Sequence, residues 1–283
     1  MGVTRQRKWT AMLRIPIAIV VTAGVCLYAA VAAQQPAPAP QFATPAPVPP
    51  LFFRETWRQT GRMDASSEFQ PAGGITPAAV TSADLELKVY DPQAARIREF
   101  AKSPPAGSRA RDWGGIACIQ LSGYNQTPTP EKVVAGQPSD PPNLWTGICM
   151  SGVAATLRHR TSYVDLTGLA RIRWVTRTSG FHVVRPVLKL ANGTWLVGDY
   201  GEGLPSSNST LFLENEFAIA SVRWLALDID RVVTRGTWIE RPDLSRVDEV
   251  GFADLLPGSG HGWGGFVNVG KIEVYGTPVP RQR

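Results

Sequence analysis

Residues 182–199, with the sequence HVVRPVLKLANGTWLVGD, constrain the fold more than any other segment. Two apolar runs flank Asn192-Gly193, a pair that tolerates the positive φ angles of a tight primed turn. Alternate side chains of a strand point to opposite faces, so the first run has an apolar face and a partly cationic face. Val184, Pro186, Leu188 and Leu190 share the first face, and Val183, Arg185, Val187 and Lys189 share the second. The sequence therefore predicts a β-hairpin with one face in the core and the other open to a ligand.

Short segments rich in Val, Thr, Trp and Tyr recur through the second half of the chain, separated by Gly, Pro, Ser or Asn. Residues 51–57 and 84–90 have the same strand character near the start of the folded part. Helical periodicity is almost absent from the second half. Short strands at this spacing are typical of an all-β fold, and we predict an antiparallel β-sandwich.

The chain begins with a basic segment and an apolar run that ends in small residues, which predicts an export signal over residues 1–33. The alternative is an uncleaved membrane anchor, because the apolar run approaches the roughly 20 residues that a span requires. Residues 34–50 form a Pro/Ala-rich linker, and residues 51–279 form the predicted domain, with an insertion around 91–150. We expect a periplasmic or extracellular protein.

Charge and cysteine content narrow the range of partners. The formal net charge of +6 falls to +2 without residues 1–33, which contain four basic residues and no acidic ones. This small excess does not favour a nucleic-acid partner. Cys118 and Cys149 then remain, and an oxidising compartment predicts a disulfide that closes a loop of about 30 residues and stabilises by roughly 3–4 kcal/mol. Two buried free thiols are the alternative.

Three segments carry a resemblance to a known fold family: Val164-Asp165-Leu166-Thr167, residues 243–252 with the sequence DLSRVDEVGF, and Ile272-Glu273-Val274-Tyr275. They resemble the galactose-binding-like jelly roll of certain carbohydrate-binding modules and of the complex I intermediate-associated proteins. The resemblance covers about two fifths of the chain and implies a jelly-roll sandwich. These motifs are structural, so they indicate fold better than activity.

The resemblance also implies a binding mode, in which sugar rings stack on aromatic side chains of one sheet face while polar groups bond to hydroxyls. The candidates for ligand contact are Arg173, Arg185, Lys189, Trp195, Asp199 and Trp263. The alternative is an ordinary solvated face with Trp195 packed inside. Many such modules hold a structural Ca²⁺ between the first and last strands, where Glu55 and Glu273 are the acids here. Surface carboxylates without a metal are the favoured reading, because calcium requires six or more oxygens.

Two other functions compete with a carbohydrate-binding module that has no catalytic activity. A glycoside-active enzyme would use the acid pairs Glu214 with Glu216 or Asp228 with Asp230, which alternation places on one strand face. No metalloprotease, nucleophile-elbow or metal-spaced histidine motif accompanies them, so no catalytic residue is assigned. The third function is a structural or assembly domain that presents its surface to another protein.

Overall fold

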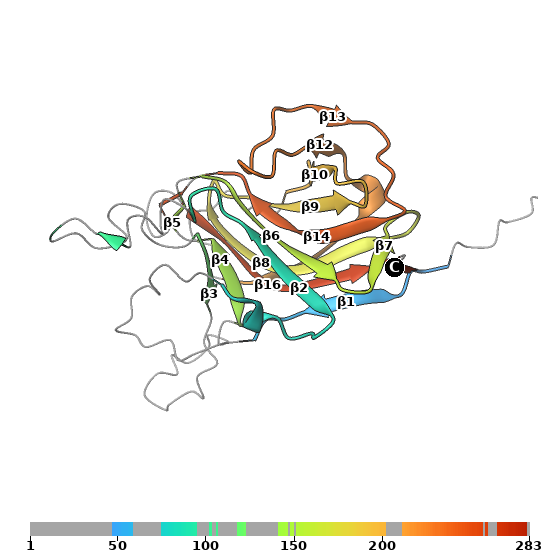
Figure 1. Cartoon of the computed structure of the whole chain (residues 1–283), viewed down its shortest axis with the longest axis horizontal. Coiled ribbons are helices and arrows are strands. Elements are labelled where there is room, and N and C mark those ends of the chain that lie inside the picture. Colours follow the sequence, from blue (N-terminus) through green and yellow to red (C-terminus); the bar gives the residue numbers. More distant parts are fainter. Residues whose placement is uncertain are drawn as a thin grey trace, which may run out of the picture. The chain divides into compact units, whose positions relative to one another are not determined.

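The structure of the protein is a computed structural model that describes residues 47–58, 75–94, 102–103, 106, 118–122, 141–146, 148–149, 151–201, 211–256, 258–259 and 265–281. These residues form two layers of antiparallel β-sheet around a common core (Figure 1). The predicted all-β sandwich is therefore confirmed. The predicted signal segment and most of the linker lie outside the described residues. No helix within the described ranges has the length and apolarity needed to cross a membrane.

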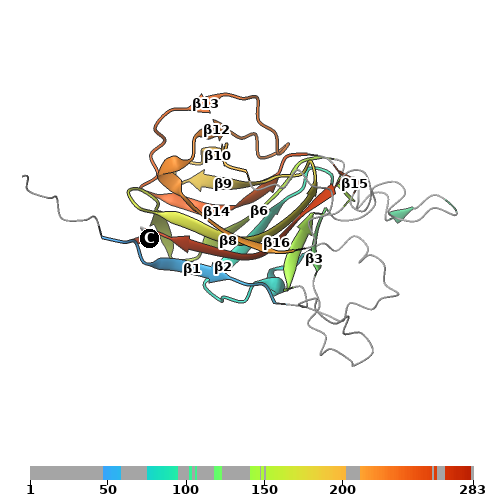
Figure 2. The ribbon, with the colours of Figure 1, turned by 180° about the vertical axis from the view of Figure 1, so that it is seen from behind.

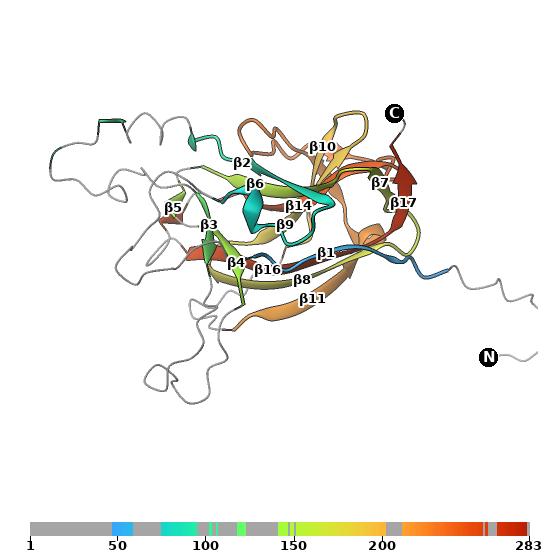
Figure 3. The ribbon, with the colours of Figure 1, turned by 60° about the horizontal axis from the view of Figure 1, so that its bottom comes forward.

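Sheet A is organised around the long strand β16. Strand β8 pairs with β16 along one edge, while β4 and β1 pair with successive parts of the other edge. Figure 2 shows β8 and β16 side by side, and Figure 3 shows that β11 lies outside β8 and β3 outside β4. The strands of sheet A are β1 (Leu51–Glu55), β3 (Ile119–Ser122), β4 (Asn143–Thr146), β8 (Arg171–Gly180), β11 (Leu213–Ala218) and β16 (Gly265–Tyr275).

Sheet B has β14 at its centre, between β9 and β6, and runs in the order β13-β12-β10-β9-β14-β6-β2. Strand β7 pairs with both β14 and β17. The strands of sheet B are β2 (Leu85–Tyr90), β6 (Val153–His159), β7 (Ser162–Asp165), β9 (Val184–Leu190), β10 (Trp195–Gly198), β12 (Trp224–Ala226), β13 (Trp238–Ile239), β14 (Val247–Asp254) and β17 (Thr277–Pro280). The short strands β5 (Ile148–Cys149) and β15 (Gly258–Ser259) pair separately, and η1 (Pro77–Ala79) and η3 (Ile219–Ser221) are single 3-10 turns.

The predicted hairpin is present as β9 and β10, with Trp195 opposite Lys189. Its turn differs from the prediction, because only Gly193 has a positive φ, of 89°. The backbone N–H of Gly193 donates to the carbonyl of Leu190 at 2.9 Å, and the Asn192 Oδ1 accepts from the Thr194 N–H at 2.9 Å. Asn192 therefore contributes through its side chain, and glycine alone supplies the left-handed conformation.

Alternation in β8 and β9 places the core between the two sheets, as predicted for β9. Ile172 and Trp174 of β8 meet Leu188 of β9 in this core, and each is at most 1% exposed. Val187 points to the opposite side of β9 and is also fully buried, under the segment between β12 and β13. This outer cluster on sheet B consists of Ala154, Val187, Val197, Leu227, Val232 and Ala253. The second face of the hairpin is thus covered in part, which the sequence pattern did not predict.

Each of the three resemblance segments includes part of a strand of the sandwich. Val164 and Asp165 belong to β7, the Gly251-Phe252 pair lies in β14, and residues 272–275 end β16. A Cβ at Gly251 would stand 2.0 Å from the carbonyl oxygen of Ala155 on β6, so the pairing of β14 with β6 requires glycine at this position. Strand β17 follows the last segment, so residues 272–275 do not form the final strand.

Candidate functional site

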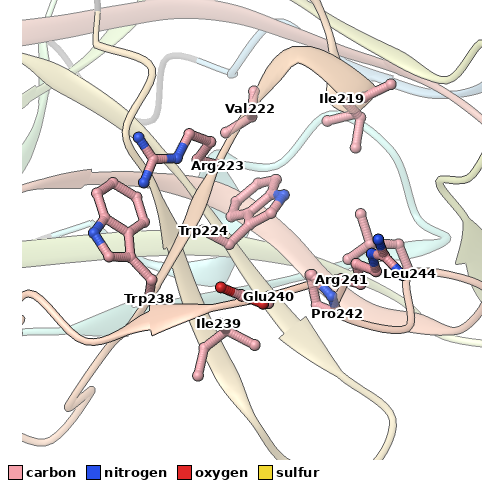
Figure 4. A pocket seen from close by; sticks show the side chains of 11 residues that line it. Ile219, Val222, Arg223, Trp224, Trp238, Ile239, Glu240, Arg241, Pro242 and Leu244 are labelled. Atoms are coloured by element: carbon pink, nitrogen blue, oxygen red, sulfur yellow. The ribbon is translucent and has the colours of Figure 1, made fainter.

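A pocket of about 480 Å³ lies beside β13, the edge strand of sheet B (Figure 4). Its walls come from η3, β12, β13 and the connection from β13 to β14. The pocket combines aromatic, cationic and acidic side chains. The residues that line it are Ile219, Ala220, Val222, Arg223, Trp224, Trp238, Ile239, Glu240, Arg241, Pro242 and Leu244.

Two indoles line the pocket, and they differ in exposure. Antiparallel pairing sets Trp224 opposite Ile239, and Trp224 packs into the main core with only 3% of its surface exposed. Trp238 pairs with Leu225 and remains 43% exposed. A large exposed aromatic beside a hollow supplies apolar contact without requiring the core to open.

Arg223 stands against Trp238 at one end of the pocket (Figure 4). The Cζ atom of Arg223 lies 3.8 Å from the centroid of the Trp238 ring, which is a cation–π contact. Asp199 holds the backbone of Arg223 on both sides. The Arg223 N–H donates to Oδ1 of Asp199 at 2.8 Å, and the Asp199 N–H donates to the carbonyl of Arg223 at 2.9 Å.

Two of the sequence-predicted ligand residues, Arg185 and Asp199, are in contact with each other, and Asp199 also contacts the backbone of Arg223. The Nη1 atom of Arg185 donates to the carbonyl oxygens of Gly198 and Asp199, at 3.3 and 3.2 Å. Neither Arg185 nor Asp199 lines the pocket at Trp238. Their hydrogen bonds join the end of β10 to the backbone of Arg223.

The other end of the pocket is formed by Arg241, Pro242 and Leu244, with Glu240 between the two ends (Figure 4). Arg241 has a φ of 49°, a left-handed conformation that is unfavourable for a non-glycine residue. It also precedes a proline, which disfavours compact conformations at the preceding residue. Strain of this kind often occurs at binding sites, where the surrounding structure holds a side chain in a required place.

Lys189 and Trp195 lie together on the outer face of sheet B, as the hairpin register predicts. Trp195 is partly exposed and meets Tyr90 edge to face, with ring centroids 4.9 Å apart. The Nζ atom of Lys189 is 5.4 Å from the centroid of the Trp195 ring. This lysine is occupied by acids, because Nζ lies 3.0 Å from Oε1 of Glu249 and 3.6 Å from Oδ2 of Asp248.

Glu249 is fully buried beneath Lys189 and gathers several donors. Its carboxylate accepts hydrogen bonds from the hydroxyls of Thr156 and Tyr90, at 2.6 and 2.8 Å, and Lys88 Nζ lies 3.4 Å away. Burial raises the pKa of Glu249, but the hydrogen bonds from Thr156, Tyr90 and Lys189 outweigh burial and hold the pKa below its ordinary value. The cluster is a satisfied buried ion site.

Arg173 is on a different sheet from Arg185, Lys189 and Trp195, which corrects the expectation of one shared cationic face. It belongs to β8 of sheet A and points away from the core that contains Ile172 and Trp174. Its guanidinium donates to Oε2 of Glu216 at 2.7 and 2.9 Å and lies 3.4 Å from Glu214. Alternation was interpreted correctly for each strand, but it does not say to which sheet a strand belongs.

The two acid pairs considered for an enzyme have different outcomes. Glu214 and Glu216 lie on β11, as predicted, and both are engaged in ion pairs with Arg173; Lys271 also pairs with Glu214 and Arg171 with Glu216. Asp228 and Asp230 do not lie on a strand, because β12 ends at Ala226 and the chain turns back so that Asp228 bridges to Val233. The strand-face geometry proposed for that second pair was therefore wrong.

The predicted disulfide is absent, since Cys118 and Cys149 are free thiols and both are buried. A hydrogen bond with Cys149 and, to a smaller extent, burial raise the pKa of the Cys118 thiol. Burial raises the pKa of the Cys149 thiol. The Nε2 of Gln93 also donates to Sγ of Cys118 at 2.8 Å. The pair is thus a hydrogen-bonded thiol contact within the core.

Trp263, the remaining predicted ligand residue, lies outside the described residues.

Glu55 and Glu273 do not come together as calcium ligands. Register sets Glu273 opposite Arg54 and Glu55 opposite Ile272, so the two carboxylates point to opposite faces of sheet A. Backbone N–H groups of Trp57 and Thr81 and the Thr81 hydroxyl surround Glu55, whereas Arg54, Lys271 and Tyr275 surround Glu273. Hydrogen-bond donors therefore surround the Glu55 carboxylate, and cations also lie beside Glu273. In the described part of the chain, no three His, Cys, Asp or Glu side chains are placed to hold a metal ion.

Sequence reasoning missed the residues that form the pocket: Arg223, Trp238, Glu240 and Arg241. A local signal exists, because WIERP at residues 238–242 combines an aromatic with charged residues and a proline in a segment without strand alternation. The contact of Trp238 with Arg223 joins positions fifteen residues apart across a strand pair, which the sequence pattern alone does not indicate.

No protein-family model matches the sequence, and no curated protein matches it. Similar solved structures include the family 11 carbohydrate-binding module of the cellulosomal cellulase Lic26A-Cel5E of Clostridium thermocellum, with 12% identity over 69% of this chain and 90% of that chain and a TM-score of 0.33. The family 11 module from Clostridium thermocellum in complex with a β-1,3-1,4-mixed-linked tetrasaccharide has 13% identity, coverage of 71% and 92%, and a TM-score of 0.32. PfGH50B has 9% identity, coverage of 57% and 22%, and a TM-score of 0.31. Similarities this low transfer no residue roles, so the function must be argued from the side chains of this chain.

Proposed function

We propose that the protein is a carbohydrate-binding protein without catalytic activity, and that it holds a glycan in the pocket at Trp238. The observation that carries this proposal is the exposed indole of Trp238 at the wall of a 480 Å³ hollow, with Arg223 and Glu240 beside it. The pocket has the size of a small-molecule site.

The chemistry of the pocket suits a sugar. A pyranose ring has apolar C–H faces that pack on an indole, and a rim of hydroxyls that both donate and accept hydrogen bonds. Guanidinium groups donate only, and a carboxylate accepts only. Arg223 and Glu240 together therefore satisfy both roles of a hydroxyl rim, while Trp238 supplies the apolar contact.

The test is a binding screen of the purified protein against soluble polysaccharides, by affinity electrophoresis and then calorimetry. We expect at least one glycan to bind, and Trp238→Ala to weaken it about tenfold or more, because loss of an aromatic contact near 1.4 kcal/mol changes affinity tenfold. Trp195→Ala is the matched control, since Trp195 is a partly exposed tryptophan of the same sheet.

Folding of each variant is checked first by thermal unfolding, because Trp195 also packs on Tyr90. Retained affinity in Trp195→Ala with lost affinity in Trp238→Ala supports the pocket. Equal losses in two folded variants, or no binding to any glycan of the panel, would refute the proposal.

We further propose that the protein is exported to the periplasm or the extracellular space and that residues 1–33 are removed. The basic start, the apolar run and the small residues before Gln34 support this proposal. Intact-mass measurement of the protein recovered from the producing cells should give a chain that begins near Ala33 or Gln34. A mass that retains residues 1–32 would instead identify an uncleaved anchor.

A further inference from the structure

We infer that the pocket at Trp238 prefers glycans that carry carboxylates, that is, chains that contain uronic acids. This inference rests on the proposed function, because it specifies the sugar that the same pocket takes. The observation behind it is the charge state of the pocket. Arg223 and Arg241 both line it, and neither guanidinium has a carboxylate partner anywhere in the described ranges.

The arginines on the strands are in a different state. Each strand arginine of the described residues forms an ion pair with a carboxylate, or donates to an amide oxygen or a backbone carbonyl of the protein itself. These arginines are Arg54, Arg158, Arg171, Arg173, Arg177 and Arg185. A ligand that approaches them must compete with a partner already in place. Within the described residues, the guanidinium of Arg223 contacts the Trp238 ring and no carboxylate or carbonyl acceptor, so its N–H donors are available to an anion there.

The positions of the two arginines suit a chain of sugars better than a single small anion. Arg223 with Trp238 forms one end of the pocket, and Arg241 with Pro242 forms the other (Figure 4). A sugar ring on Trp238 therefore brings a ring carboxylate within reach of Arg223. The next residues of the glycan extend toward Arg241, which is exposed.

Glu240 sets the balance of charge in the pocket. It lies between the two ends and has no cationic partner within the described part of the chain, so the pocket carries two positive charges and one negative charge (Figure 4). Its carboxylate accepts hydrogen bonds from hydroxyls, which favours a sugar over a simple carboxylic acid. It also repels a uronate, so its removal is expected to raise the affinity for acidic glycans.

The backbone conformation of Arg241 provides a second, independent test of this inference. Its φ of 49° is unfavourable for arginine but suits glycine. Arg241→Gly should therefore fold at least as well as the natural protein while it loses the cation. If the strain is kept because Arg241 contacts the ligand, Arg241→Gly should lower the affinity without lowering the stability. If Arg241 has no role in binding, the affinity should be unchanged.

The experiment compares polygalacturonate and alginate with their methyl esters, which keep the backbone and remove the charge. We expect the acidic forms to bind about tenfold tighter than the esters. Arg223→Ala and Arg241→Gly should each reduce the ratio of acid-form to ester-form affinity to about threefold or less, and Glu240→Gln should raise this ratio. Arg235→Ala is the matched control, because Arg235 is an exposed arginine between β12 and β13 that does not line the pocket.

The possible failures separate this inference from the proposed function. Equal binding of acid and ester forms, or binding of neutral glycans alone, overturns the uronate preference and leaves carbohydrate binding intact. An equal fall of the acid-to-ester affinity ratio in Arg235→Ala, or equally tight binding of dextran sulfate, overturns the uronate preference in favour of general charge attraction. Absence of binding to every glycan, acidic or neutral, overturns both.

Discussion

Two regions of sheet B place a cation beside an indole, and only one of them has its cation available. On the outer face, Lys189 lies over Trp195 and is bonded to Glu249 and close to Asp248. In the pocket, Arg223 lies on Trp238 and meets no carboxylate in the described part of the chain. The combination of an aromatic with a cation therefore does not by itself identify a binding site. Whether the protein already neutralises the cation decides what remains for a ligand.

The difference follows from burial. Glu249 is inaccessible to water, so its charge must be compensated within the protein, and Lys88, Lys189, Tyr90 and Thr156 do this. Glu240 in the pocket is exposed, and water compensates its charge without fixing a neighbouring cation. The charges of the buried cluster are thus compensated by groups of the protein, whereas the charged groups of the pocket are exposed to water.

The largest effect is expected from Glu249→Ala. Removal of the carboxylate leaves the Tyr90 and Thr156 hydroxyls without their acceptor and Lys88 and Lys189 without their nearest carboxylate. We expect a loss of about 3 kcal/mol in the free energy of unfolding. Urea unfolding measures it. The matched control is Glu214→Ala, an exposed ion-pair carboxylate whose loss should cost under about 1 kcal/mol. Similar small losses in both variants would mean that the Glu249 cluster is not a stabilising element.

Acidic pH should lower the free energy of unfolding, because it protonates the paired carboxylates. Asp248, Glu249 and Glu273 all have pKa values below their ordinary range, because hydrogen bonds and nearby cations outweigh the opposing effect of burial. A depressed folded-state pKa contributes stability that is fully present above the ordinary pKa and is lost as the pH falls through the folded one. We therefore expect a constant free energy of unfolding from pH 7 to about 5, and a decline below the ordinary glutamate value of 4.5.

Glu249→Gln sharpens this pH prediction. The variant should be less stable at neutral pH, and its stability should depend less on pH below 4.5, because one of the titrating groups is gone. Urea titrations at several pH values provide the comparison. Parallel pH profiles of the variant and the natural protein would show that Glu249 does not contribute to the acid loss.

A smaller effect on binding is expected from Asp199→Ala. This change removes the acceptor of the Arg223 backbone N–H but removes no side chain that lines the pocket. We expect glycan affinity to fall several-fold, with about 1 kcal/mol of stability lost with the hydrogen bond. Asp165→Ala is the control, since Asp165 accepts from the Thr167 N–H in a similar way and neither residue lines the pocket. An equal change of affinity in both variants would count against the positioning role of Asp199.

The smallest effect on binding is expected from Lys189→Ala. Its ammonium is bonded to Glu249, so its removal changes stability and leaves the pocket at Trp238 untouched. Calorimetric titration of the folded variant should give an affinity within about twofold of the natural protein, a difference below 0.5 kcal/mol. A loss of tenfold or more would transfer the binding site to the outer face of sheet B.

Much of the fold could be predicted from local pattern, because alternation and turn residues act over a few positions. The hairpin, β1, β2 and the outward direction of Arg173 and Lys189 follow from period-two alternation. Sheet membership does not, since Arg173 and Lys189 face opposite outer surfaces of the sandwich. The pocket also escaped prediction, because its indole and its arginine meet only after β12 and β13 pair.

The most direct test of the central claim follows the indole N–H resonances of the ¹⁵N-tryptophan-labelled protein during titration with the glycan that binds best. Trp238→Phe and Trp195→Phe assign the two signals that matter. We predict that the Trp238 resonance shifts to saturation with the calorimetric affinity while the Trp195 resonance stays in place. A saturating shift of Trp195 with Trp238 unmoved would contradict the pocket and return the binding site to the face that contains Lys189.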